Sequence, residues 1–179
     1  MSQHFKFIAT KIDGLYVIER NLIEDDRGFF GRFFCAEDYK ELGFSQSIKQ
    51  INHSLTKHKG SIRGMHFQNS PYTEKKIVSC IKGKVFDVAV DIRKDSPTYL
   101  HWHGEVLSAD KRSSFYIPDG FAHGFQTLTD NCQLLYIHSE FYKPDAEGVL
   151  NAFDSKIDIA WPLDVTEMSD RDRNSTLID

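Results

Sequence analysis

Apolar and polar positions alternate along most of the chain in short runs, which predicts many short β-strands separated by turns. Asp13 and Gly14 lie between two apolar runs and form a strong hairpin signal. Many short strands at regular spacing are typical of a barrel or a double-sheet sandwich. We expect strands over residues 5–12, 15–19, 28–34, 47–54, 61–68, 76–81, 85–93, 115–117, 121–128 and 133–142.

Helical patterns are confined to two short stretches. Residues 36–42 have apolar positions three apart, and Gly43 suits the C-terminal cap of a helix there. A second short helix is expected near residues 168–173, within the polar C-terminal tail. The length of 179 residues suffices for one domain with a sizeable core, and no repeat or linker divides it. We therefore predict a single all-β domain over residues 1–179 with short flanking helices.

Composition narrows the functional classes. A formal net charge of -4 argues against general nucleic-acid binding, although a local basic pocket for a small anion remains compatible with it. The three cysteines are odd in number and widely spaced, which predicts no disulfide framework and a reducing, cytoplasmic setting. The N-terminus lacks a signal-peptide pattern, and no apolar run reaches the roughly 18 residues of a membrane helix.

Histidine suits proton transfer near neutral pH, so the histidines are the first candidates for catalysis. His66 has anion-binding neighbours in Arg63, Gly64 and Lys76. In a regular strand Arg63 and His66 would face opposite ways, because they are an odd number of positions apart. Gly64 could supply a bulge that re-aims one of the two side chains.

Other polar residues stand out less by themselves. Asp87 and Asp91 lie on one face of a predicted strand, and the other face of that strand is apolar. The face with the two acids is therefore either exposed to solvent or lines a polar cavity. His123 follows a tight turn, where a barrel would open. Tyr136 shares a strand face with His138. Nothing local distinguishes Asp172, which lies in a run of charges.

Together, five segments resemble the dTDP-4-dehydrorhamnose 3,5-epimerase family. They read DRGFF (26–30), QINHS (50–54), RGMHFQ (63–68), VFDVAVDIR (85–93) and IPDGFAHGF (117–125). The resemblance extends from about Gly14 to Asp172, and the order and spacing of the segments make it specific. It implies a cupin-type jelly-roll barrel, no metal or organic cofactor, and a homodimer that exchanges N-terminal strands.

The resemblance also implies roles for individual residues. His66 resembles the family's general base, Asp172 the carboxylate that orients it, Tyr136 the acid on the opposite face of the sugar, and Lys76 the cation beside the C4 carbonyl oxygen. The implied substrate is a nucleoside-diphosphate 4-keto-6-deoxy sugar, with dTDP as the expected nucleotide. The positions implied to bind it are Arg27, Phe30, Gln50, Asn52, Arg63, Asp87, His123 and Tyr142, of which Phe30 and Tyr142 would stack the base.

Inversion of a carbon beside a ketone requires a base, an acid and a group that stabilises the enolate, which these residue types can supply. A hydrogen beside a ketone is weakly acidic, and the ketone itself accepts the electrons as an enolate, so no cofactor is required. A histidine whose tautomer is fixed by a carboxylate can remove the proton. A lysine at the oxyanion stabilises the enolate. A neutral tyrosine on the other face can then return a proton and invert the carbon at C3, C5 or both.

Three departures from the family pattern bear on the number of inverted carbons and on the exact sugar. Ile137 stands where rhamnose-pathway enzymes usually carry lysine, as in relatives that invert one centre. Arg32 replaces an acidic residue, and Ala152 and Phe153 replace a Trp-Asn pair.

Three alternatives stay open from the sequence. A keto-sugar isomerase of the same superfamily would need only the same enolate. A metal-dependent cupin oxygenase would use His101 and His103, which are two positions apart and so point the same way in a strand, although no partner ligands follow closely. A binding module without catalysis would hold the sugar nucleotide and exchange no proton.

Overall fold

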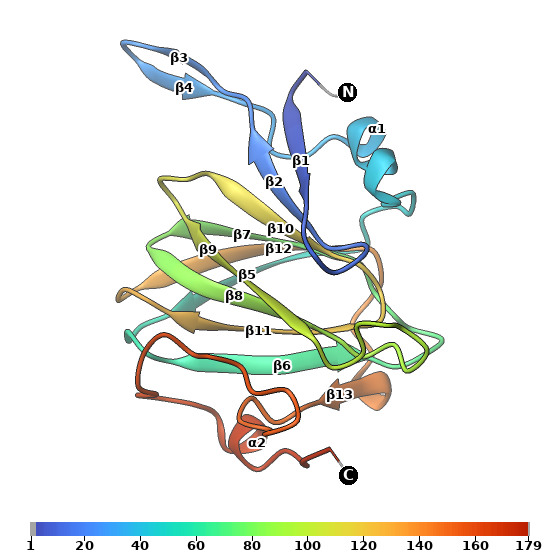
Figure 1. The fold of residues 1–179 in the computed structure, drawn as a ribbon. Coiled ribbons are helices and arrows are strands. Elements are labelled where there is room, and N and C mark those ends of the chain that lie inside the picture. Colours follow the sequence, from blue (N-terminus) through green and yellow to red (C-terminus); the bar gives the residue numbers. More distant parts are fainter. Residues whose placement is uncertain (1–2, 179) are drawn as a thin grey trace.

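Two antiparallel sheets form the body of the computed structural model, which describes residues 3–178. The larger sheet has the strand order β1-β2-β10-β7-β12-β5, and the smaller one β13-β6-β11-β8-β9 (Figure 1). The larger comprises β1 (Phe5–Ala9), β2 (Tyr16–Arg20), β10 (Ser113–Ile117), β7 (Lys76–Lys82), β12 (Cys132–His138) and β5 (Gln50–Thr56). The smaller comprises β13 (Glu147–Val149), β6 (Ile62–Gln68), β11 (Phe121–Thr127), β8 (Lys84–Asp91) and β9 (Trp102–Ser108). The predicted all-β architecture is confirmed.

The main core lies between the two sheets. Side chains at alternate positions point inward, as the period of two requires. The inward apolar set includes Val78 and Leu134 from the larger sheet and Ala89 and Phe125 from the smaller one, each 0–2% exposed. Asp87 lies on this inner face, so the polar face of its strand lines the barrel interior.

Both outer faces carry further apolar layers. On the larger sheet, α1 (Ala36–Tyr39) and the 3-10 turn η1 (Lys40–Leu42) cover Ile77 and Ile137. On the smaller sheet, the chain after β13 packs Ala152 and Ile157 against Val88 and its neighbours. That segment contains α2 (Asp170–Arg173), and the 3-10 turn η2 (Pro144–Ala146) precedes β13. The C-terminal tail is therefore a packed layer, and it brings α2 against β6.

A two-stranded hairpin projects from the barrel beyond β2 (Figure 1). It consists of β3 (Ile23–Asp25) and β4 (Gly28–Phe30), and all six of its strand residues are exposed. The predicted strand over 28–34 therefore ends at Phe30. The predicted strand over 133–142 likewise ends at His138, so the residues after it do not continue the alternation of β12.

Gly64 marks an irregularity in the pairing of β6 with β11. His66 pairs with His123, and Arg63 pairs with Phe125. Between these two pairs β6 advances by three residues, whereas β11 advances by only two. Gly64 has φ +123°, and a Cβ there would lie 2.6 Å from the Cα of Gly124. Only glycine fits this close approach. The bulge places Arg63 and His66 on the same side, as the sequence suggested.

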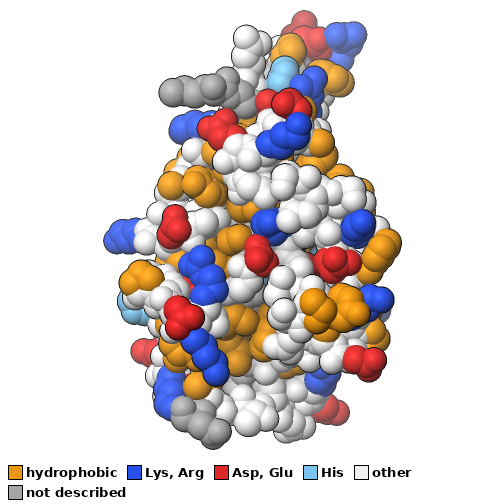
Figure 2. All heavy atoms as spheres, turned by 90° about the vertical axis from the view of Figure 1, so that its right-hand side faces the viewer, with side chains coloured by type: hydrophobic (Ala, Val, Ile, Leu, Met, Phe, Trp, Pro, Cys, Tyr) orange, Lys and Arg blue, Asp and Glu red, His pale blue; other side chains and the backbone are white. Residues whose placement is uncertain are grey.

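Charged side chains of both signs are interspersed with apolar ones on the face shown in Figure 2. Within residues 3–178 no helix is long and apolar enough to cross a membrane.

Candidate active site

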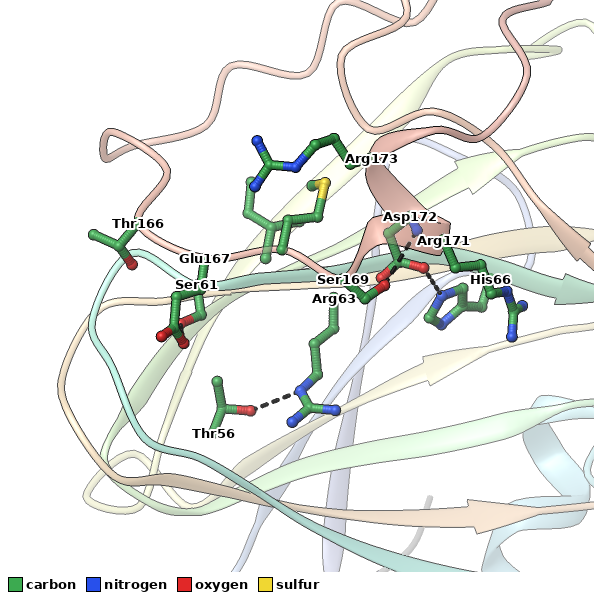
Figure 3. Close-up of a pocket in the computed structure, with 12 residues that line it drawn as sticks. Thr56, Ser61, Arg63, His66, Thr166, Glu167, Ser169, Arg171, Asp172 and Arg173 are labelled. Atoms are coloured by element: carbon green, nitrogen blue, oxygen red, sulfur yellow. Dashed lines mark hydrogen bonds and ion pairs between the residues drawn. The ribbon is translucent and has the colours of Figure 1, made fainter.

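A pocket of about 280 Å³ opens into the barrel between the two sheets. Residues from both sheets line it: Asn52, Ser54, Arg63, His66, Glu74, Lys76, His123, Phe125, Tyr136 and His138. A larger cleft of about 750 Å³ lies between β6 and the C-terminal segment and shares Arg63 and His66 with the pocket (Figure 3). The two cavities therefore meet at these two side chains.

His66 is held by a carboxylate from the C-terminal segment. Its Nε2 lies 2.8 Å from Oδ1 of Asp172, which is 3% exposed (Figure 3). The other oxygen, Oδ2, accepts the Gly64 N–H at 3.1 Å, and Ser169 caps α2 by accepting the Asp172 N–H. Burial would raise the pKa of the Asp172 carboxyl, but the bond from His66 and the backbone bond hold it below its ordinary value. Asp172 is thus ionised, and Nε2 of His66 carries a proton, leaving Nδ1 as the free base.

Tyr136 enters the pocket from the opposite sheet. Its hydroxyl lies 3.1 Å from the Ser54 hydroxyl. Burial raises the pKa of the Tyr136 hydroxyl, so it stays protonated through the neutral range. The pocket thus has a histidine on β6 and a protonated tyrosine on β12.

Lys76 provides a buried cation on β7. The residue is 5% exposed, and its Nζ donates to Oε1 of Glu74 at 2.9 Å. The other oxygen of Glu74 lies 2.7 Å from Nδ1 of His138. Burial would raise the pKa of Glu74, but these partners lower it to about 2, so the carboxylate is ionised.

His123 and Asp87 form a second buried pair in the barrel. His123 Nε2 lies 2.9 Å from Asp87 Oδ1, and the two residues are 6% and 0% exposed. Burial raises the pKa of Asp87, and the neighbouring His123 opposes that rise. His123 also packs edge-on against the ring of Tyr136. The pair therefore lies beside Tyr136 in the pocket wall.

Arg63 and Asn52 line the pocket, and hydrogen bonds connect Asn52 to Gln50 and Gln50 to Tyr142. Arg63 is exposed and its Nε donates to Thr56 at 3.0 Å (Figure 3). Gln50 and Asn52 face inward from β5, and Gln50 Oε1 accepts the Tyr142 backbone N–H at 2.8 Å. The Tyr142 ring is exposed, and its hydroxyl donates to Glu147.

Arg27 and Phe30 do not line the pocket of their own chain. Both lie on the projecting hairpin, where Arg27 pairs with Asp25 and Phe30 is 76% exposed. Of the other ten predicted site residues, seven line the pocket or the cleft. The remaining three, Gln50, Asp87 and Tyr142, lie one hydrogen bond behind that lining or further. The placement of the hairpin residues could not be foreseen from strand periodicity, because the hairpin leaves the barrel.

Sequence reasoning did not single out five residues of the site: Ser54, Glu74, His138, Ser169 and Arg171. His138 was noted only as sharing the strand face of Tyr136. Glu74 lies in the turn before β7, where no alternation exists to place it. Arg171 lines the cleft and ion-pairs with Glu147 at 2.6 Å.

His101 and His103, which the oxygenase alternative would use as metal ligands, are not arranged as a metal site. His103 lies 3.9 Å from Glu105 and packs against Phe115, whereas His101 precedes β9. Among residues 3–178 no three or more His, Cys, Asp or Glu side chains come together as a set that could hold a metal ion.

Comparison with known proteins agrees with this geometry. The family model described as dTDP-4-dehydrorhamnose 3,5-epimerase matches residues 9–179. The dTDP-4-dehydrorhamnose 3,5-epimerase of Salmonella typhimurium is 41% identical over 174 residues, covering 96% of this chain and 94% of that protein. This chain belongs to the dTDP-4-dehydrorhamnose 3,5-epimerase family.

Solved structures of relatives show the same fold. The epimerase of Legionella pneumophila, in complex with dTDP-4-keto-L-rhamnose, has a TM-score of 0.92 at 41% identity, covering 97% of this chain and 93% of that one. The Bacillus anthracis enzyme with TDP and PPi bound has a TM-score of 0.93 at 37% identity, covering 97% and 99%. A 3'-monoepimerase from Streptomyces bikiniensis, with dTDP-quinovose, has a TM-score of 0.87 at 31% identity, covering 95% and 86%.

The family, the cupin-type barrel and the isomerase class inferred from the sequence are therefore confirmed. This epimerase acts in deoxysugar chemistry, as its family does. Ile137, the departure beside Tyr136, is 3% exposed and packs on the outer face of the sheet with Tyr39 and Phe44. It does not line the pocket, so any effect it has on the reaction is indirect.

Proposed function

We propose that this epimerase inverts both C3 and C5 of dTDP-4-keto-6-deoxyglucose, using His66 as the base and Tyr136 as the acid. The observation that supports the proposal best is their placement on opposite sheets of one pocket. A sugar ring lying between β6 and β12 presents one face to His66 and the other to Tyr136. Removal of a proton from one face and its return to the other inverts the carbon.

The proton steps follow from the partners of each residue. His66 Nδ1 takes the hydrogen beside the C4 ketone, and Asp172 stabilises the imidazolium that forms. General base catalysis of this kind contributes a factor on the order of 10²–10⁴. The Tyr136 hydroxyl then protonates the enolate carbon from the opposite side. The same pair can serve C3 and C5, because both carbons adjoin the ketone.

Lys76 is the residue that we assign to the enolate oxygen. Its buried ammonium keeps two N–H donors beyond the one bound to Glu74. A fixed cation at the forming oxyanion is worth on the order of 3 kcal/mol in the transition state. Since the ketone itself is the electron sink, the proposed reaction uses no metal or organic cofactor.

The diphosphate has a suitable place at the junction of the pocket and the cleft. Arg63 lines both cavities, and Arg171 and Arg173 line the cleft. Guanidinium groups match phosphate oxygens in charge and in geometry. We assign Gln50 and Asn52 to substrate binding and Tyr142 to the nucleotide base. dTDP-linked sugars are bound by the relatives from Legionella pneumophila and Streptomyces bikiniensis.

A homodimer would explain the projecting hairpin. Its apolar side chains Ile23, Phe29 and Phe30 are 57–76% exposed, which is costly for a free hairpin. Ile51 and Leu55 are also exposed on the outward face of β5, at the edge of the larger sheet. We propose that the hairpin of one protomer reaches the pocket of its partner, where Arg27 and Phe30 complete the nucleotide site.

A mixing experiment tests this exchange. Arg27→Ala and His66→Asn proteins should each be nearly inactive, and co-refolded mixtures should regain activity, because one pocket of each heterodimer has both residues intact. Random pairing of equal amounts predicts about a quarter of wild-type activity. No recovery in verified heterodimers would show that Arg27 acts within its own chain or not at all.

The reaction itself is tested by product analysis. Wild-type protein should convert dTDP-4-keto-6-deoxyglucose into dTDP-4-keto-L-rhamnose, and His66→Asn should not. GDP- and CDP-linked analogues should be turned over more slowly. Faster turnover of either analogue would replace the nucleotide assignment. A cytoplasmic setting stays a prediction.

A further inference from the structure

His138 lies at the centre of a row of polar residues that crosses three strands of the larger sheet. In the sheet register it pairs with Gln50 on β5 and with Lys76 on β7. The residue is 8% exposed, and its ring stacks on that of Tyr136, with centroids 6.1 Å apart. It lines the same pocket as the base and the acid, and the reaction steps above give it no role.

The donor and the acceptor of each hydrogen bond in this row are fixed by a backbone N–H at one end of the row. The Tyr142 backbone N–H can only donate, so Gln50 must present Oε1 to it. Gln50 Nε2 is then left to donate to Asn52 Oδ1 at 3.4 Å. Asn52 in turn directs Nδ2 at Nε2 of His138, also at 3.4 Å. The backbone donor thus fixes the orientation of both amides.

The same logic fixes the proton on His138. Because Asn52 Nδ2 is a donor, Nε2 of His138 must accept, and the ring proton is on Nδ1. Nδ1–H then donates to Glu74 Oε2 at 2.7 Å, while Lys76 donates to Oε1 of the same carboxylate at 2.9 Å. Glu74 therefore receives one donor on each oxygen and holds the ammonium on one of them.

We propose that His138 is a positioning residue: held as the neutral Nδ1–H tautomer, it ties Gln50 and Asn52 to the Glu74–Lys76 pair and fixes where the lysine ammonium sits in the pocket. This inference rests on the proposed function for the role of Lys76. Without the His138 donor, Oε2 of Glu74 is free to take a second ammonium N–H, which draws Lys76 away from the substrate oxygen. Residue 138 is thus a determinant of the enolate-forming step, although no step of the reaction passes through it.

The tautomer is measured directly by ¹⁵N NMR on histidine-labelled protein, at a pH where free imidazole is neutral. Loss of signals in His138→Phe, which keeps a ring against Tyr136, identifies the resonances. We expect a protonated Nδ1 and a bare Nε2 in the wild type. Among residues 3–178, Asn52 is the one donor that contacts Nε2, and Asn52→Asp replaces it with an acceptor, so Nε2 should become protonated. A wild-type Nε2–H tautomer, or an unchanged spectrum in Asn52→Asp, would overturn the inference.

Steady-state kinetics of His138→Phe test the positioning role. His138→Phe should lower kcat at least about tenfold, because a hydrogen bond to a charged group is lost. His101→Phe, outside the pocket on the approach to β9, is the matched control and should keep wild-type kcat. Wild-type kcat in a folded His138→Phe protein would refute the positioning role. An inactive wild-type protein contradicts the proposed function instead, and the tautomer measurements then decide the inference alone.

Discussion

His66 Nε2 lies 2.8 Å from Asp172 Oδ1, although the two residues are 106 positions apart in the chain. The contact exists because the C-terminal segment packs on the smaller sheet and brings α2 against β6. It makes Nδ1 of His66 the free base and gives the imidazolium a fixed counter-charge.

Asp172→Asn should therefore cost far more activity than stability. The amide can still accept the Gly64 N–H, but it then presents NH₂ to Nε2, which moves the ring proton to Nδ1 and removes the base. We expect kcat to fall by a factor on the order of 10² or more. Steady-state kinetics and thermal unfolding, measured together, test this. A parallel loss of folded protein, with normal kcat for the folded fraction, would contradict it.

Tyr136→Phe should separate proton removal from inversion. His66 remains on the opposite sheet, so it can still take the proton, exchange it with solvent and return it to the same face. We expect deuterium to enter the sugar with retained configuration while inverted product falls by a factor on the order of 10². Ser54→Ala removes only the partner of the hydroxyl and should keep measurable inversion. Normal inversion by Tyr136→Phe would exclude it as the acid.

Gly64→Ala should destabilise the fold by more than backbone conformation alone explains. Its φ of +123° is close to the +126° of Gly28, but a Cβ at Gly28 meets nothing within 4 Å. Both variants carry the conformational cost, of roughly 1–3 kcal/mol. Only Gly64→Ala also pushes β6 away from β11. Denaturant unfolding should show the larger loss for Gly64→Ala, and equal losses would contradict the close approach.

Glu74 should make stability depend on acid pH. Its pKa in the folded protein is about 2, below the ordinary value of about 4.3, so its contribution is full above that value and is lost as pH falls toward 2. The contribution is on the order of 3 kcal/mol. The difference in unfolding free energy between wild type and Glu74→Gln should be large at neutral pH and shrink in acid. A difference independent of pH would contradict the assignment.

Much of the pocket was predictable, because strand alternation and motifs act locally. The inward face of β8 and the opposed faces of Tyr136 and Ile137 follow from a period of two, and Gly64 indicates where β6 departs from that period. The family resemblance was needed for Asp172, because no local pattern indicates which part of a polar tail returns to the barrel. Neither strand alternation nor the family resemblance indicated Glu74, because it lies in a turn and its contacts involve residues of other strands. Arg27 and Phe30 lie on a hairpin that leaves the barrel, where the alternation of the barrel strands does not place their side chains.

The central claim is that protons are removed beside the ketone and returned to the opposite face at two carbons. Its most direct test is to incubate the wild-type protein with dTDP-4-keto-6-deoxyglucose in deuterated water and follow C3 and C5 by NMR. We predict deuterium at both carbons, with inverted configuration at each. Deuterium at one carbon alone would make this a monoepimerase. No exchange at either carbon would contradict the account.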